Sequence, residues 1–512
     1  AVCRDDFRPA HLYASIFSFI ILLVWTNRYL TLTLLPWGLA FYLIFAVLHS
    51  LLPVVLQKIR PTTSIPNWSY FFPPMMLILI MFPLIKEPVT SIIIWPFVFL
   101  ISAVAVASAM MMAIAWVSGV VLILTMTALG IWTSKMQDVC NLSEWLILVT
   151  FFVLAFFAWG LYAARKKLSG EEEKEKKTLR EIKPEQITQL SSLSAILPFA
   201  LLSIAISRLK MYNPSPIFGL VVLLIILLLG LVRYRATDSV GVIAMLSTAM
   251  VQYIWHISYF NPQNPIIALI WYFVFYGVFT IFPFIFMKHM TDRIIPWAVA
   301  AFVGPIQFYL IHKVVSLSMG TEYIGLLPAI FAVLSLVCLL AIIKFSPSEN
   351  PIRKSQLALF AGVSLFFITL IFPLQFEKQW ITIGWALEGV ALLWLLRRIP
   401  HQGLKIWGAG LLIIAFVRLS LNPAVFSYHP REIYRVFNWY LYSYGIVTVC
   451  LFAGAKLLAR AGDEIMGYKM THVLNSVGTI LAFLLLNIEI ADYFSTGSTI
   501  TFQFSGSLAR DM

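Results

Sequence analysis

The sequence predicts an all-α fold, a polytopic transmembrane helical bundle of about 17 spans with a cytoplasmic N-terminus. The first observation is composition: of the 512 residues, 61% are hydrophobic and 12% are charged, whereas ordinary soluble domains carry about 25% charged residues. The second is length, because apolar runs of about 17 to 25 residues recur, each able to cross a hydrocarbon core of about 30 Å. The third is that these runs are continuously apolar, whereas strands of membrane barrels alternate residue by residue.

About six apolar runs precede the first strongly charged segment. They cover residues 11–27, 32–56, 69–85, 90–109, 112–133 and 143–164, and the boundary between the fourth and the fifth falls near the stretch MMMAIAW. Each is long enough to cross a bilayer as a helix. We therefore expect residues 1–164 to form an N-terminal membrane bundle.

A charged segment, ARKKLSGEEEKEKKTLREIKPEQ, follows at residues 164–186. It mixes charges of both signs, with Lys and Glu repeatedly four residues apart, which is typical of a short solvated helix. The segment predicts a charged cytoplasmic linker over residues 165–188, with a docking module as the alternative.

The remaining apolar runs fall into two groups. The middle group comprises residues 190–207, 215–232, 239–258, 265–287, 295–314 and 325–343, which predicts a middle membrane bundle over residues 189–350. The last group comprises residues 356–373, 379–396, 404–421, 438–456 and 472–489, which predicts a C-terminal membrane bundle over residues 351–512. No internal repeat is visible that would indicate an inverted-repeat transporter.

The net charge of +13 agrees with membrane residence. With a cytoplasmic N-terminus, most Lys and Arg residues fall on cytoplasmic loops, as the positive-inside rule requires, although Arg208 and Lys210 fall outside. No basic run is interleaved with aromatic residues, so a nucleic-acid partner is not favoured. The lipid bilayer is the expected partner, and the sequence names no protein partner.

The sequence carries no motif for a metal, a cofactor or a catalytic residue. Its four cysteines form no CxxC pair, so neither a disulfide framework nor a zinc site is predicted. Glycine-rich phosphate loops, HExxH and GxSxG are absent from the sequence. The start at Ala1 and the end GSLARDM suggest a fragment of a longer protein.

One carboxylate lies deep inside a predicted span. Glu388 is near the middle of residues 379–396, where a charge costs about 3 kcal/mol on insertion scales. Arg418, near the outer end of the next span, could reach toward it while its stem packs on apolar surface. Two interpretations stay open: a buried ion pair that fixes packing, with Gly389 allowing close approach, or a water-filled outward-facing pocket.

Further polar residues gather at the same predicted level of the C-terminal bundle. We predict a binding site made of Glu388, Arg418, Asn438 and Glu489, because charged groups inside spans mark sites or structural pairs. Trp385 is interpreted as a packing or interface residue. Outside this bundle, His49 lies alone in an apolar run, where a histidine is more often hydrogen-bonded packing than a proton relay. The other supporting residues on these spans and their loops are Gln375, Arg435 and Asp492.

Three segments resemble a known family. They are IFPLQFEKQWITIGWALEGVALLWLLRR, FNWYLYSYG and LNIEIADYF, and they are similar to the bacterial membrane proteins of domain of unknown function 2339. The WALEGxxLLW core is the most specific part. The resemblance implies a long polytopic protein of the bacterial cytoplasmic (inner) membrane, and transfers no activity. The residues that it highlights are Trp385, Glu388, Gly389, Asn438, Tyr444, Gly445 and Glu489.

Three functions remain possible from the sequence. The leading hypothesis is transport or binding of a small polar or lipid-linked solute at the outward-facing polar site. In it, Glu388 supplies charge or proton coupling, and Arg418 is its counter-ion or an anion ligand. The second is a cell-envelope enzyme, a transferase on a lipid-linked substrate, with an essential carboxylate in an outer loop. The third is a structural or assembly protein whose intramembrane charges serve only packing.

Overall fold

Helices account for nearly all of the residues that the computed structural model describes. The structure describes residues 8–59, 68–86, 92–111, 115–136, 142–168, 184–233, 238–320, 322, 324–347, 349–375, 380–398, 400, 402–421, 437–461, 464–465, 467–495 and 500. Within these ranges, every predicted span coincides with one α-helix, which confirms the all-α polytopic fold.

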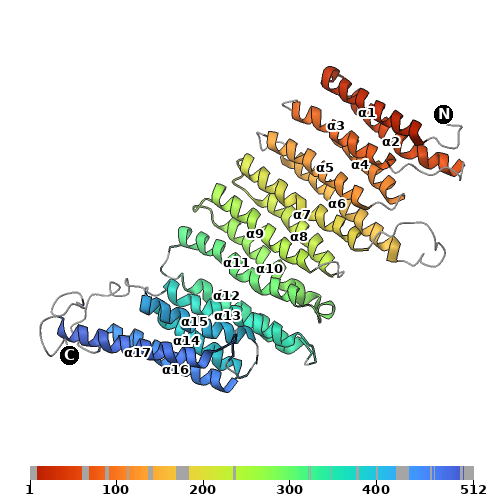
Figure 1. Cartoon of the computed structure of the whole chain (residues 1–512). Coiled ribbons are helices and arrows are strands. Elements are labelled where there is room, and N and C mark those ends of the chain that lie inside the picture. The colour runs from red at the N-terminus through yellow and green to blue at the C-terminus, as the bar shows by residue number, and fades with distance from the viewer. Residues whose placement is uncertain are drawn as a thin grey trace. The chain divides into compact units, whose positions relative to one another are not determined.

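The first nine helices lie within residues 8–259 (Figure 1). They are α1 (Arg8–Tyr29), α2 (Leu35–Ile59), α3 (Phe72–Lys86), α4 (Ile94–Met111), α5 (Ala115–Lys135), α6 (Leu142–Leu168), α7 (Pro184–Arg208), α8 (Ser215–Arg233) and α9 (Ser239–Tyr259), with a 3-10 turn η1 (Ser69–Phe71) before α3.

Eight further helices follow. They are α10 (Ile266–Ile285), α11 (Ile294–Ser318), α12 (Leu326–Phe345), α13 (Arg353–Gln375), α14 (Trp380–Leu396), α15 (Gln402–Leu421), α16 (Trp439–Ala461) and α17 (Met470–Phe494), with a 3-10 turn η3 (Met287–His289) after α10.

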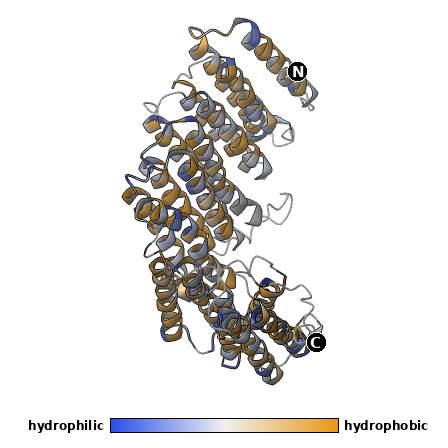
Figure 2. Cartoon of the chain, turned by 90° about the vertical axis from the view of Figure 1, so that its left-hand side faces the viewer, coloured by the Kyte–Doolittle hydropathy of each residue, from blue (hydrophilic) through white to orange (hydrophobic). Residues whose placement is uncertain are grey.

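Helix length and composition suit a membrane. Among the described residues, 15 helices are long and apolar enough to cross one, and two shorter apolar helices cover Ile94–Ala109 and Trp380–Leu396. In Figure 2 most of the helical ribbon has the orange of apolar residues. Large apolar side chains are exposed on many helices, such as Ile21 on α1 and Phe483 on α17. Such surfaces are unusual on soluble monomers and are expected where lipid covers them.

One element was not predicted. An antiparallel hairpin of two short strands, β1 (Glu464–Ile465) and β2 (Tyr468–Lys469), joins α16 to α17. Gly467 in its turn has φ of +82°, a conformation that costs glycine little and other residues more. The segment GDEIMGYK lacks a long alternating pattern, so sequence periodicity could not reveal strands this short.

The chain divides into two compact units, Ala1–Trp271 and Tyr272–Met512. The predicted boundary at residues 165–188 lies within the first unit, and that near residue 350 lies within the second. Most of the predicted linker, residues 169–183, is outside the described residues. The organisation into three bundles and the cytoplasmic N-terminus both stay predictions.

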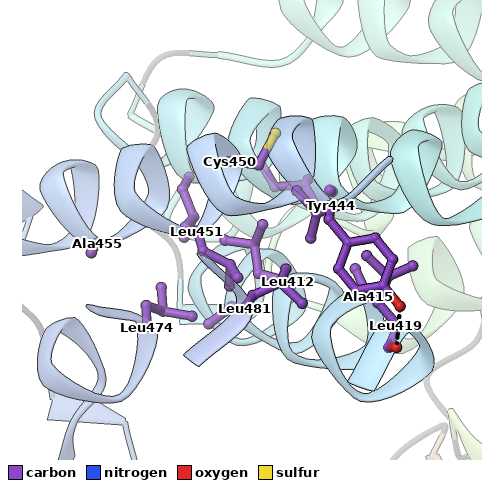
Figure 3. Close-up of a cluster of buried hydrophobic side chains, with 14 of the residues drawn as sticks. Leu412, Ala415, Leu419, Tyr444, Cys450, Leu451, Ala455, Leu474 and Leu481 are labelled. Atoms are coloured by element: carbon purple, nitrogen blue, oxygen red, sulfur yellow. Dashed lines mark hydrogen bonds between the residues drawn. The ribbon is translucent and has the colours of Figure 1, made fainter. Parts of the chain in front are cut away.

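The C-terminal helices pack around one apolar core. In the second unit, α14 contacts α15 and α16, and α16 contacts α17. Figure 3 shows Leu412 and Ala415 of α15 beside Leu451 of α16 and Leu481 of α17, and all four side chains are buried. The Tyr444 side chain lies in this core, and its hydroxyl donates a hydrogen bond to the Leu419 carbonyl oxygen at 2.9 Å. These contacts hold the polar residues of the same helices in fixed positions.

Two glycines let α14 and α15 approach closely. A Cβ atom at Gly389 would lie 2.9 Å from the Gly408 carbonyl oxygen and 2.8 Å from Leu412, and one at Gly408 would lie 3.1 Å from the Gly389 carbonyl oxygen. Small residues at helix crossings are the usual means of close packing in membranes. The expected role of Gly389 in close approach is therefore visible, with Gly408 as its partner.

We predict that Gly389→Ala lowers the free energy of unfolding by about 1–3 kcal/mol, because overpacking forces backbone shifts. Gly410→Ala is the matched control, since a Cβ atom at Gly410 on α15 meets nothing within 4 Å. Thermal unfolding of both variants in lipid nanodiscs measures the effect. Equal melting temperatures for the two variants would contradict this account of the crossing.

Candidate functional site

Asn438 begins helix α16 and joins it to the end of α17. Its side-chain Oδ1 accepts a hydrogen bond from the Leu441 backbone N–H at 3.0 Å, which is the bond that an N-cap residue makes. Its Nδ2 group donates to Glu489 Oε2 and to Asp492 Oδ2, both at 3.2 Å. An amide carries two N–H donors, so one buried side chain caps a helix and donates a hydrogen bond to each of two carboxylates.

Glu489 and Asp492 lie three residues apart on α17, so their side chains share one helix face. Asp492 is 2% exposed, as is Asn438. Glu489 is partly exposed, yet its Oε1 atom is buried with no hydrogen-bond partner within the described residues. We call Asn438, Glu489 and Asp492 the Asn438 cluster. It presents an acceptor atom that a ligand with an N–H or O–H group could satisfy.

An open groove borders this cluster between α16 and α17. Its volume is about 580 Å³, and Glu489 is the charged residue in its lining. Leu441 lines it from α16, and the other lining residues come from α17: Ala482, Leu485, Leu486, Glu489, Ile490, Tyr493 and Phe494. Apolar walls with a few placed polar groups are typical of small-molecule sites. We call this feature the α16–α17 groove.

Glu388 forms part of a second polar group on α13, α14 and α15. Its carboxyl group shares a hydrogen bond with the side chain of Thr369 on α13. The Thr369 hydroxyl also lies 2.8 Å from the Leu365 carbonyl oxygen, within donating distance. A hydroxyl has one hydrogen, so Thr369 can donate to only one of these two acceptors at a time.

Arg418 lies beside the same helix. Its guanidinium Cζ is 5.4 Å from the ring centroid of Trp385, which is three residues before Glu388 on α14. This geometry is a cation–π contact, so Trp385 holds a charge from the next helix in addition to packing. An ion pair between Glu388 and Arg418 stays a prediction.

The other predicted residues lie in different places. Gln375 holds a loop: its Oε1 accepts from the Gly325 N–H at 3.0 Å, and its Nε2 donates to the Glu322 carbonyl oxygen at 2.9 Å. Gly445 faces Leu485 across α16 and α17 at an ordinary packing distance. Arg435 is outside the described residues.

Sequence reasoning missed two features of this region. Thr369 is an unremarkable threonine within an apolar run, and only the packing of α13 on α14 makes it the partner of Glu388. The groove is formed by apolar residues that look like any other lipid-facing residues. Neither feature left a distinct signal in the sequence, because both depend on which helix faces which.

A separate polar network ties together the first helices of the other unit. Trp68 Nε1–H donates to His11 Nδ1 at 3.1 Å, and His11 Nε2 lies 3.2 Å from the His49 carbonyl oxygen. An indole nitrogen only donates and a carbonyl only accepts. His11 is therefore in its neutral form with the hydrogen on Nε2.

His49 belongs to the same network and is not alone as its sequence context suggested. Ser15 Oγ donates to the His11 carbonyl oxygen at 2.8 Å, so His49 Nδ1, 3.1 Å away, donates to Ser15 Oγ. His49 Nε2, 3.2 Å from Ser18 Oγ, then accepts. This chain ends on a backbone carbonyl, which cannot pass a proton onward. These hydrogen bonds tie α1 and α2 to each other and to Trp68, just before η1.

Within the described residues, no group of three or more His, Cys, Asp or Glu side chains could hold a metal ion. Cys338 and Cys450 are free thiols, and Cys3 and Cys140 are outside the described residues.

A family model described as "Predicted membrane protein (DUF2339)" matches residues 200–509. This match covers more than half of the 512 residues. The chain belongs to this family. No curated protein and no solved structure matches it.

Membership of DUF2339 confirms the resemblance seen in WALEGVALLW, FNWYLYSYG and LNIEIADYF, and together with the helices it makes the chain an integral multi-pass membrane protein. The DUF2339 match contains the Asn438 cluster, the groove, and the group around Glu388. The His11 network lies before the match. The bacterial origin and the inner-membrane location stay predictions.

We predict that Asn438→Ala destabilises the protein through two losses. The missing cap costs about 0.5–2 kcal/mol, and two carboxylates lose their shared donor, which adds about 1–3 kcal/mol. Asn487→Ala is the control, because the exposed Asn487 side chain donates to the Phe483 carbonyl oxygen of its own helix and joins no second helix within the described residues. In thermal unfolding in nanodiscs, the melting temperature of Asn438→Ala should lie well below that of Asn487→Ala. Equal melting temperatures would rule out the bridging role.

For the His11 network, we predict that Trp68→Phe lowers the free energy of unfolding by about 1–3 kcal/mol, because it removes the indole N–H that donates to the buried His11 Nδ1. Trp37→Phe on α2 is the control, since Trp37 is 66% exposed. The measurement is again thermal unfolding of the reconstituted protein. A Trp68→Phe variant as stable as Trp37→Phe would show that the network contributes nothing to packing.

Proposed function

We propose that the C-terminal helices bind a small polar or lipid-linked solute within the membrane, at the Asn438 cluster, and that this binding serves transport. In this proposal the protein lies in the bacterial cytoplasmic membrane with its N-terminus in the cytoplasm. The end of α17 that carries Glu489 and Asp492 then faces outward.

One observation carries the proposal: among the described residues, buried Glu489 Oε1 has no hydrogen-bond partner, and Glu489 lines an open groove. A buried acceptor left unsatisfied costs about 1–3 kcal/mol. A solute that donates an N–H or O–H group to this atom would remove that cost and so gain affinity. Asn438 and Asp492 position the glutamate, because the Asn438 amide holds both carboxylates at once.

Glu388 and Arg418 supply what transport would need besides a binding site. An intramembrane carboxylate can change its charge as a solute moves, and charged groups inside spans commonly serve such coupling. Glu388 is assigned this role, with Thr369 as its hydrogen-bond partner. Arg418, held over Trp385, is assigned the role of counter-ion or anion ligand.

The site should be wet, and cysteine labelling tests this. In a chain with Cys140→Ala, we predict that the Glu489→Cys variant reacts with a membrane-impermeant maleimide added outside intact cells. Ile480→Cys, on the same helix and 50% exposed, should react about tenfold more slowly, because the reactive thiolate does not form in lipid.

Correct insertion of both variants is checked first by size-exclusion chromatography of the purified protein. Labelling of Glu489→Cys no faster than Ile480→Cys would mean a sealed cluster, and the packing interpretation would replace the proposal. Labelling only after the cells are permeabilised would reverse the orientation of α17.

A further inference from the structure

We infer that the solute is a membrane lipid with a primary ammonium headgroup, whose acyl chain lies in the α16–α17 groove. This inference rests on the proposed function and names its ligand class. It is argued from the groove, from the charge of its lining and from the route by which a ligand would enter.

The groove has the dimensions of an acyl-chain site. Its α17 lining runs from Ala482 to Phe494, which are twelve residue steps apart, or about 18 Å at 1.5 Å per step. This is slightly more than half of a hydrocarbon core of about 30 Å, so the groove matches one leaflet. Its volume of about 580 Å³ lies within the usual range of ligand sites, about 300–1,000 Å³.

The lining changes character along this length. The deep part is made by Ala482, Leu485 and Leu486, which offer only apolar contacts. Glu489 follows, and Tyr493 and Phe494 stand at the end of the helix, where aromatic residues typically mark the membrane interface. A chain in the deep part therefore places its headgroup at Glu489 and Tyr493.

The charge of the site selects the headgroup. Glu489 and Asp492 are both acidic, and carboxylates accept hydrogen bonds without donating them when ionised. A primary ammonium group supplies a positive charge and N–H donors for Glu489 Oε1. A choline headgroup has the charge but no N–H, and an anionic headgroup would be repelled. The expected order of binding is therefore ammonium, then choline, then anionic lipid.

Lipid can reach the groove sideways from the bilayer. Leu486 is 57% exposed and Tyr493 48% exposed on the same stretch of α17. These side chains form an apolar rim that hydrocarbon would cover. A ligand dissolved in the outer leaflet could slide between α16 and α17 without crossing water.

The test uses the full chain in nanodiscs with equal amounts of phosphatidylethanolamine and phosphatidylcholine that carry identical acyl chains. These two lipids differ at the headgroup nitrogen, N–H against N–methyl. Native mass spectrometry then measures which lipid stays bound. We expect phosphatidylethanolamine to be enriched about tenfold or more, since hydrogen bonds to charged groups are the strong ones. This comparison needs no variant, so a folding defect cannot obscure it.

Three variants locate the site. Ala482→Phe fills the deep part of the groove and should abolish bound lipid, whereas Thr479→Phe, exposed on α17 one turn away and outside the groove, should retain it. Glu489→Leu removes the acceptor together with the charge, and should bring the two lipids to nearly equal binding. Melting temperatures confirm that each variant is folded.

Other results would overturn the inference in distinguishable ways. Equal binding of both lipids to the unmodified chain would exclude ammonium selection, and enrichment unchanged in Ala482→Phe would exclude the groove. A dimer seated on α17 in place of lipid would also overturn it. If these occur while Glu489→Cys still labels from outside, the proposed polar site stands without its lipid. If labelling fails too, both proposals fall.

Discussion

The rest of this structure depends on the absence of water from the hydrocarbon core. A backbone N–H or C=O group there has no solvent partner, so each segment must satisfy its own groups, which a helix does completely. This explains why the described segments that connect one loop to the next are helices. It also explains why the β1–β2 hairpin lies in the connection between α16 and α17. Under the same constraint, a polar side chain inside a helix must find its hydrogen-bond partner within the protein.

The protein supplies these hydrogen-bond partners in two ways. Many hydroxyl groups bond back to the carbonyl four residues earlier, as Thr26 does to Leu22 and Thr248 to Ala244. The larger polar groups instead join different segments: Tyr444 on α16 donates to the Leu419 carbonyl on α15, and Trp68, just before η1, donates to His11 on α1. These inter-helix bonds position helices that apolar packing alone would leave free to slide, because lipid tails are as apolar as the helix surfaces.

Asn438 combines both roles, and the site depends on this. Its side-chain oxygen caps the N-terminus of α16 by accepting from the Leu441 N–H. Its amide hydrogens then donate to Glu489 and Asp492. Two carboxylates can then stay close together at the end of α17, where repulsion and burial would otherwise separate them. Within the part of the chain that the structure describes, Glu489 Oε1 beside the α16–α17 groove is left without a hydrogen bond. The acidic cluster is thus connected to the packing of α16 on α17, and a change in that packing would alter the chemistry at Glu489.

The sequence by itself determined the span pattern, the family and the residue types at the site. Continuous apolar runs of membrane length can form little else than helices, and Glu388, Asn438 and Glu489 stand out because polar residues are rare in such runs. Only the tertiary structure decided the partners. It placed Asn438 with Glu489 and Asp492, Glu388 with Thr369, Arg418 over Trp385, and Gln375 on a loop. It also divided the chain at residue 271 and formed the α16–α17 groove. The physical reason is that helix periodicity fixes which residues share a face, whereas the neighbour of each face is chosen by packing across many residues at once.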